Sequence, residues 1–204
     1  MGIITEIKFQ KKNKNRVSVY VDGEFVTGLE SIIVATKGIK VGDYASEQEL
    51  IALAFESQKS EAFDKAIKYI SASMRTEKEV RDNLIKKEYP KAVVDYAVSK
   101  LKEYGYLNDE AYLSAYIKTY AEVRGVNRIK MELLNKGVDK ELVENALEEL
   151  DDQSEAAKRT AEKYIRTHKN ANRQKLMQYL YSKGFTYSDI SEAVAEIDFP
   201  EEDE

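Results

Sequence analysis

Hydrophobic and polar positions change their spacing near residue 46. Before it, the stretch RVSVYVDGEFVTG alternates apolar and polar side chains on both sides of Asp22-Gly23, a dipeptide that favours a hairpin turn. The segment IITEIKF reads as a third strand, so we expect a small antiparallel sheet. Because so few strands are marginally stable alone, the sheet should pack on a helix. From residue 46 to residue 198 the apolar spacing is helical, and Ser46 with Glu49 predicts a capping box at the first long helix.

One short pattern occurs three times in the helical part. The stretches LIKKEY, LLNKGV and LYSKGF begin at Leu84, Leu133 and Leu180, which are 49 and 47 residues apart. When the copies are aligned, the apolar positions around them coincide, including Ile85 and Tyr181, and this agreement indicates an internal repeat. A further helix precedes each copy, around 61–72, 109–123 and 154–168, so we expect units of three helices.

The pattern predicts a helix end, a tight turn and the start of the next helix. Gly137 and Gly184 can take the left-handed conformation that ends a helix, and an apolar residue after each can form a hydrophobic staple. The first copy has Glu88 instead, so we expect its turn to differ. The lysine before each of these positions complements the negative end of the helix dipole.

Charge is unevenly distributed along the chain, which carries −5 overall. Residues 158–183 hold eight basic residues and one acidic residue, a net charge of +7, and acidic residues dominate the last seven positions. Such a segment suits contact with phosphates or with acidic protein patches, and a solvated helix face is the alternative. Its candidate binding residues are Lys158, Arg159, Lys163, Arg166, Lys169, Arg173, Lys175 and Lys183.

Two further arginines, Arg75 and Arg124, align just before the middle helix of the first two units. They are candidates for partner contact, with a local salt bridge or cap as the alternative. The stripe formed by Tyr112, Tyr116 and Tyr120 favours packing against a neighbouring helix over stacking with bases. The single histidine, His168, is expected at the surface.

The sequence lacks the parts of common catalytic sites. It has no cysteine, one histidine and no glycine-rich phosphate loop, so we expect no enzyme activity, no metal and no cofactor. The first residues do not form a signal peptide, and no apolar run approaches the length of a membrane span. These features favour a cytoplasmic protein without membrane contact.

Taken together, the motifs resemble those of the RecX regulatory proteins. The segment GYLND (residues 105–109) links the first two repeats, and RTEKEV (residues 75–80) is similar to the opening of a RecX repeat. The hairpin around VYVDGEF looks like the β extension of longer members. The resemblance covers about residues 3–198, and Glu88 is its one marked departure.

The resemblance implies both a fold and a function. The fold would be mainly α, an elongated array of three tandem three-helix repeats with a small N-terminal antiparallel β region. The function would be binding of the RecA recombinase filament on single-stranded DNA and modulation, mainly inhibition, of RecA in recombination and the SOS response. We expect a monomer that bridges several RecA protomers, with at most weak direct DNA binding. The alternatives are a sequence-independent DNA-binding protein of helix-turn-helix-like repeats and a helical scaffold for an unrelated protein.

The expected boundaries follow the repeats. They are a β-hairpin region with a short helix at 1–45, a connecting helix with the first repeat at 46–108, the second repeat at 109–152, the third at 153–198 and an acidic tail at 199–204.

Overall fold

The computed structural model of the chain describes residues 1–11, 13–148, 150, 152–195, 197 and 199. Most of the acidic tail expected at 199–204 therefore lies outside the described residues. The chain forms two compact units: the first contains residues 1–73 and 80–106, and the second contains residues 74–79 and the chain from 107 onward.

The first unit opens with the expected antiparallel sheet, whose strands are β1 (Gly2–Phe9), β2 (Arg16–Val21), β3 (Glu24–Glu30) and β4 (Tyr44–Ala45). The strand order is β3-β2-β1-β4. Asp22 and Gly23 form the turn between β2 and β3 with φ angles of 51° and 87°, as an Asp-Gly hairpin requires. The short fourth strand was not predicted, because a two-residue strand is too short to show an alternating pattern.

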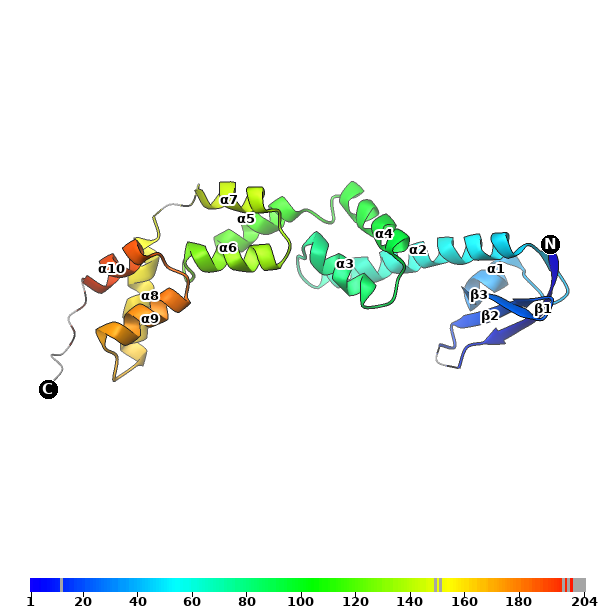
Figure 1. Cartoon of the computed structure of the whole chain (residues 1–204), viewed down its shortest axis with the longest axis horizontal. Coiled ribbons are helices and arrows are strands. Elements are labelled where there is room, and N and C mark those ends of the chain that lie inside the picture. Colours follow the sequence, from blue (N-terminus) through cyan, green and yellow to red (C-terminus); the bar gives the residue numbers. More distant parts are fainter. Residues whose placement is uncertain (12, 149, 151, 196, 198, 200–204) are drawn as a thin grey trace. The chain divides into compact units, whose positions relative to one another are not determined.

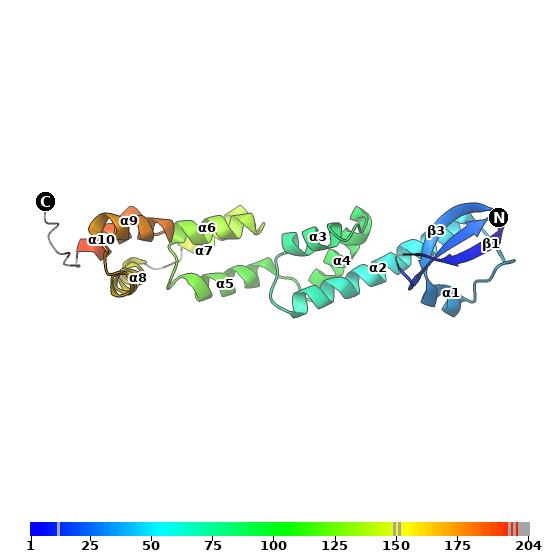
Figure 2. The ribbon, with the colours of Figure 1, turned by 90° about the horizontal axis from the view of Figure 1, so that it is seen from below.

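One face of the sheet packs against a long helix. After α1 (Ser31–Lys37), the helix α2 (Glu47–Ser71) begins at the predicted capping box, in which Ser46 and Glu49 exchange hydrogen bonds. Figure 2 shows the first half of α2 beside the strands. The shared core contains Ile4, Val17, Val19, Val21, Leu29, Leu50 and Ala54.

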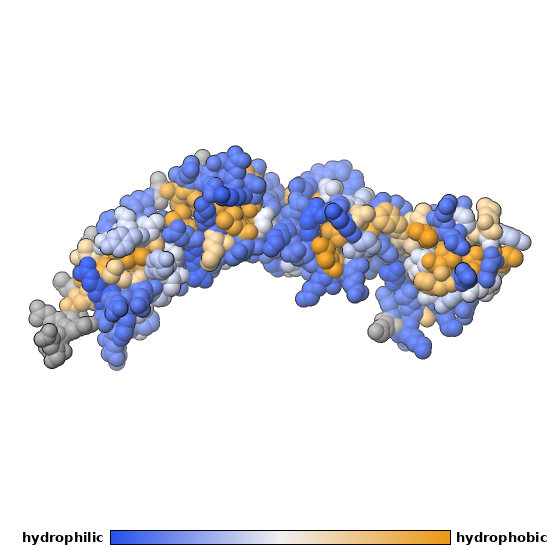
Figure 3. Space-filling view, viewed as in Figure 1, coloured by the Kyte–Doolittle hydropathy of each residue, from blue (hydrophilic) through white to orange (hydrophobic). Residues whose placement is uncertain are grey.

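Other apolar side chains of this region remain at the surface. Phe9 and Phe25 are more than half exposed, as is Ile32 of α1. In Figure 3 hydrophobic side chains accordingly come to the surface over the sheet.

Three repeats of three helices follow the sheet in sequence (Figure 1). The first consists of the second half of α2, α3 (Glu77–Ile85) and α4 (Lys91–Glu103). The second consists of α5 (Asp109–Tyr120), α6 (Val126–Asn135) and α7 (Lys140–Glu148), and the third of α8 (Ser154–Thr167), α9 (Arg173–Ser182) and α10 (Tyr187–Ala195). The fold is therefore mainly α with a small antiparallel sheet, as the sequence predicts.

Each repeat buries equivalent positions of its middle helix. Val80 and Leu84 of α3 are fully buried, and so are their counterparts in α6 and α9. The next aligned position is apolar or aromatic in all three copies, yet Ile85 is 58% exposed and Tyr181 is 76% exposed. The reason is geometric, because one further residue turns the side chain by about 100° out of the narrow apolar stripe.

All three repeats use the same turn after the middle helix. Gly137 and Gly184 have φ angles of 81° and 90°, and Glu88 has a φ of 64°. In the first copy the N–H of Tyr89 donates to the carbonyl of Leu84 at 3.3 Å, and the corresponding bonds in the other copies measure 3.1 and 3.3 Å. The expectation that the first turn would differ is therefore wrong, because Glu88 itself adopts the left-handed conformation.

Glycine is required at residue 184 for a second reason, which is a close approach by another backbone. The N–H groups of Gly125 and Asn127, at the start of α6, donate to the carbonyls of Lys183 at 2.9 Å and Gly184 at 3.1 Å. A Cβ on Gly184 would lie 2.4 Å from the backbone nitrogen of Arg128. The start of one helix thus docks on the end of another, with favourable alignment of their dipoles.

The start of α3 docks on the turn of the second repeat in a similar way. The hydroxyl of Thr76 donates to the carbonyl of Lys136 at 2.6 Å, and the ammonium of Lys78 donates to that of Asn135 at 2.9 Å. A Cβ on Gly137 would come within 2.5 Å of the Lys78 side chain. Both glycines therefore serve contacts as well as turns.

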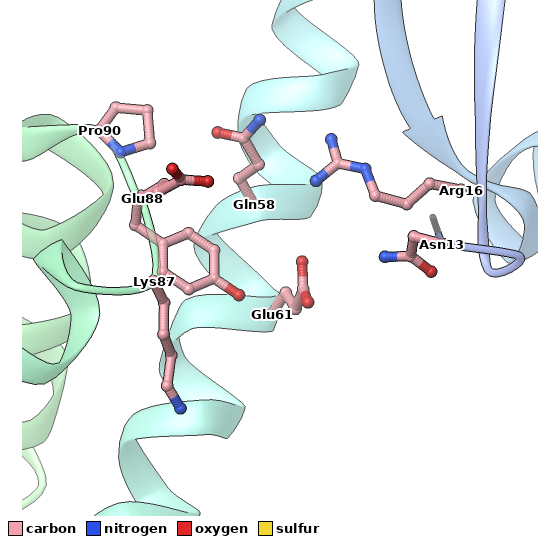
Figure 4. A pocket seen from close by; sticks show the side chains of 8 residues that line it. Asn13, Arg16, Gln58, Glu61, Lys87, Glu88 and Pro90 are labelled. Atoms are coloured by element: carbon pink, nitrogen blue, oxygen red, sulfur yellow. The ribbon is translucent and has the colours of Figure 1, made fainter. Parts of the chain in front are cut away.

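The turn at Glu88 instead borders a polar hollow within the first unit. Asn13 and Arg16 line it from the sheet side, Gln58 and Glu61 from α2, and residues 87–90 from the turn (Figure 4). Glu88 is exposed, so no helix start in the described part of the chain lies against its side chain as one does against the glycine of the other two turns.

Candidate functional site

The basic segment predicted from the sequence lies on α8, on the loop that follows and on α9 of the third repeat. α8 places its buried alanines Ala157 and Ala161 against the core of the repeat, so its basic residues occupy the remaining faces. The structure thus brings the candidate residues of 158–183 into one repeat, but it gives them different surroundings.

Two of these residues, Lys158 and Arg159, are held by carboxylates. The ammonium of Lys158 lies 3.4 Å from Glu155 and 3.1 Å from Glu192. The guanidinium of Arg159 forms an ion pair with Glu122. Their charges are largely compensated within the protein.

Five candidates have no such compensation. They are exposed, and none forms an ion pair with a carboxylate in the described part of the chain; Lys175 alone makes a local bond, donating to the carbonyl of Asn170 at 3.2 Å. We call these five the basic surface: Lys163, Arg166, Lys169, Arg173 and Lys175.

The lysines that precede the three turns, Lys87, Lys136 and Lys183, also differ in what their side chains contact. The ammonium of Lys136 pairs with Glu79 at 2.7 Å. Burial lowers the pKa of Lys136, but its hydrogen bonds and charge interactions with Glu79 and Tyr112 together outweigh burial and raise that pKa. The ammonium of Lys183 lies 5.0 Å from the ring centre of Tyr179. Lys87 lines the polar hollow beside Glu88.

Arg124 participates in a local network. Its guanidinium binds Glu132, donates to the Tyr116 hydroxyl at 2.9 Å and lies 3.8 Å from the ring centre of Tyr120. The geometry thus corresponds to the salt-bridge alternative for Arg124. Arg75 lies near Glu79. Burial raises the pKa of Glu79, but the hydrogen bonds from Lys136 and from the N–H of Thr76, with the charges of Lys136 and Arg75, outweigh burial and lower that pKa.

The tyrosine stripe of α5 packs as expected. Tyr112 is buried, its ring stacks with Tyr116 at 5.9 Å, and Tyr116 contacts Tyr120 at 4.5 Å. The Tyr116 hydroxyl donates to Glu132 at 2.6 Å, and burial, reinforced by this bond, raises its pKa to about 12. These rings support the Arg124 network.

Glu132 is the acceptor at the centre of this network, and its loss should destabilise the second repeat. Burial raises the pKa of Glu132, but the bonds from Tyr116 and Arg128 and the charge of Arg124 outweigh it and lower the pKa below its ordinary 4.5. The ionised Glu132 side chain therefore contributes its full stabilisation of the folded protein above pH 4.5, and this contribution is lost as the pH falls through the depressed pKa of Glu132. We expect Glu132→Gln to lower the free energy of unfolding at neutral pH by about 1–2 kcal/mol, with a smaller difference in acid.

Urea unfolding of both proteins at neutral and acidic pH measures this effect. Glu144→Gln is the matched control, since Glu144 lies on α7 of the same repeat and pairs with Lys130 at a more exposed position. Equal losses for the two variants, or a Glu132→Gln loss that does not change with pH, would contradict the assignment.

An aromatic column in the third repeat was not recognised in the sequence. The ring of His168 stacks on Tyr164 at 4.0 Å, and Tyr164 stacks on Tyr179 at 4.5 Å. The spacing of Tyr164 and His168 by four residues was a usable signal. Tyr179 comes from another helix, and its position in the column could not be read from spacing.

The contacts of Lys78 and Arg128 with the turns were also missed. The guanidinium of Arg128 donates to the carbonyl of Ser182 at 3.0 Å, in addition to its bond with Glu132. Backbone carbonyls carry no sequence signal, so such acceptors remain hidden until the fold is known.

No cluster suited to a metal ion occurs among the described residues. Within the same part of the chain, no helix is both long and apolar enough to cross a membrane. The residues identified above can supply positive charge and aromatic faces, which are the chemistry of a binding surface.

Comparison with protein families gives matches along most of the chain. The model of the regulatory protein RecX N-terminal domain matches residues 2–45. Those of the first, second and third three-helix domains of RecX match residues 62–101, 108–147 and 151–194.

Individual relatives agree with these matches. The regulatory protein RecX of Clostridium botulinum (strain Eklund 17B) is 34% identical over 206 residues, covering 96% of each chain. That of Bacillus licheniformis is 32% identical, covering all of this chain and 80% of the relative. A crystal structure of a regulatory protein RecX superimposes with a TM-score of 0.65 at 27% identity, covering 96% of this chain and 100% of the other. That of RecX from Lactobacillus salivarius gives 0.60 at 29% identity, covering 68% and 96%.

Proposed function

Because this chain belongs to the RecX family of regulatory proteins, we propose that it binds RecA filaments on single-stranded DNA and modulates RecA, mainly as an inhibitor. In this role it acts in the cytoplasm as a monomer, without a cofactor, in recombination and the SOS response. The proposal follows from the family and from the surface that the third repeat presents.

The observation that carries the proposal is the uncompensated charge of the basic surface. Five exposed cations gather in one repeat of a chain whose net charge is −5. Since the rest of the chain is acidic, attraction to a nucleoprotein filament has to come from a local patch, and the basic surface is such a patch.

The repeat architecture allows this charge to contribute to binding at several points along a filament. Helical repeats present side chains along several consecutive units, so one molecule can contact neighbouring RecA protomers and gain avidity from linked contacts. In this mechanism the chain lies in the filament groove, blocks incoming duplex and opposes filament growth. The basic surface contacts phosphates or acidic patches there, and binding therefore weakens as salt rises.

The direct test is RecA-catalysed ATP hydrolysis on single-stranded DNA with this protein titrated in. We expect hydrolysis to fall at substoichiometric amounts, because one bound molecule affects several protomers, and the effect to weaken with added salt. Bovine serum albumin at the same concentration provides the control for crowding. Undiminished hydrolysis at a molar excess of the protein would refute the proposal.

A further inference from the structure

The aromatic column of the third repeat is fixed at one end and open at the other. Tyr164 and Tyr179 pack against the buried core of the repeat, which includes Leu176, Leu180 and Phe185. His168, at the end of α8, is exposed. The rings are nearly parallel, with angles of 16° between His168 and Tyr164 and 30° between Tyr164 and Tyr179.

Hydrogen bonds restrain the outer ring. The Nδ1 atom of His168 lies 2.9 Å from the carbonyl oxygen of Tyr164 and 2.9 Å from the hydroxyl of Thr167. The backbone N–H of His168 also donates to the carbonyl of Tyr164 at 3.0 Å. A ring held in this way loses little freedom when another flat group stacks on it.

Basic residues flank the outer ring of the column in the sequence. Lys163, Arg166 and Lys169 lie within five residues of His168, and the ammonium of Lys183 lies 5.0 Å from the Tyr179 ring centre at the inner end. The sequence from 163 to 183 contains no aspartate or glutamate. The column therefore combines an aromatic face with positive charge.

We propose that an unpaired nucleobase of single-stranded nucleic acid stacks on His168 and continues the column, while the basic surface holds the adjoining phosphates. Flat bases and phosphates are the two groups that such a site accommodates together. An acidic peptide would use the cations but leave the ring unoccupied, and a duplex would hide its base faces. The inference rests on the proposed function in that it assigns the DNA contact within the filament to this column.

Fluorescence anisotropy with free oligonucleotides and no RecA tests this site separately from filament regulation. The probes are a labelled oligothymidylate and an abasic oligomer of the same length, which has the same phosphates but no bases. The wild type should bind oligothymidylate more tightly than the abasic oligomer. We expect His168→Ala to weaken oligothymidylate binding roughly fivefold or more and to leave abasic binding unchanged.

Two further variants distinguish stacking from other effects. His168→Phe retains a flat ring and should restore oligothymidylate binding, whereas Tyr181→Ala removes a highly exposed tyrosine outside the column and should have no effect. The proposal is overturned if His168→Ala binds oligothymidylate as the wild type does, if it weakens both probes equally, or if neither probe binds. Inhibition of RecA together with any of these results would leave the proposed function standing and refute the stacking site alone.

Discussion

Replacing Arg166, Lys169 and Arg173 together by glutamate should raise the concentration needed to inhibit RecA ATP hydrolysis by about tenfold or more, because like charges facing each other across an interface cost several kcal/mol. All three residues are exposed, and none pairs with a carboxylate in the described part of the chain. The substitution therefore breaks no ion pair between described residues, and its effect should appear in binding. The dependence of inhibition on salt should weaken at the same time.

A matched triple variant tests whether position or total charge matters. Lys65, Lys68 and Lys118 are also exposed lysines on helices, and none of them belongs to the third repeat. Their replacement by glutamate changes the net charge by the same amount and should leave inhibition close to that of the wild type. Similar losses in both variants would indicate a nonspecific charge effect, and full inhibition by the Arg166, Lys169 and Arg173 variant would remove the basic surface from the mechanism.

The largest effect on stability is expected from Gly184→Ala. Residue 184 has a φ of 90°, which is costly for any residue with a Cβ, and the new Cβ would lie 2.4 Å from the backbone nitrogen of Arg128. Backbone cannot move aside as a flexible side chain can, so the docking of α6 on this turn must loosen. We expect the free energy of unfolding to fall by about 2–4 kcal/mol, as measured by chemical denaturation.

Two other turn positions separate backbone strain from the clash. Gly105 has a φ of 68° with nothing within 4 Å of an added Cβ, so Gly105→Ala should show the smaller cost of strain alone. Glu88→Gly removes a left-handed residue with a Cβ and should leave stability unchanged or slightly raised. If Gly184→Ala costs no more than Gly105→Ala, the close approach to Arg128 is not a significant constraint.

Local patterns were sufficient to predict the repeats and the turns of the second and third copies. The alternation around Asp22-Gly23, the Ser46 capping box and the glycines at 137 and 184 each depend on neighbours in sequence, and all appear in the structure. Glu88 showed the limit of this reasoning. A missing glycine suggested a different turn, but the left-handed conformation is tolerated there because the turn borders an open hollow. Whether a turn meets another backbone or an open hollow depends on tertiary structure and cannot be read from local sequence.

For the candidate site as well, the sequence predicted part of the features, and the rest could only be seen in the folded structure. Charge counting located the basic segment, but it could not separate Lys158, which pairs with Glu192, from Lys163, which pairs with no carboxylate among the described residues. Glu192 lies on α10 and Glu122 lies after the end of α5, so compensation of Lys158 and Arg159 depends in part on the fold. The same holds for the aromatic column, since Tyr179 joins Tyr164 across two helices.

Glu88 also bears on how the number of repeats can change. Gly137 and Gly184 each receive the start of a helix from the preceding part of the chain, whereas a unit placed ahead of the first repeat would meet the Cβ of Glu88. Duplication or engineering should therefore succeed more readily with a copy of the second or third repeat, which brings its own glycine. Insertion of a repeat before the first repeat would first require Glu88→Gly. Because of this single residue, the number of repeats should increase more readily after the first repeat than before it.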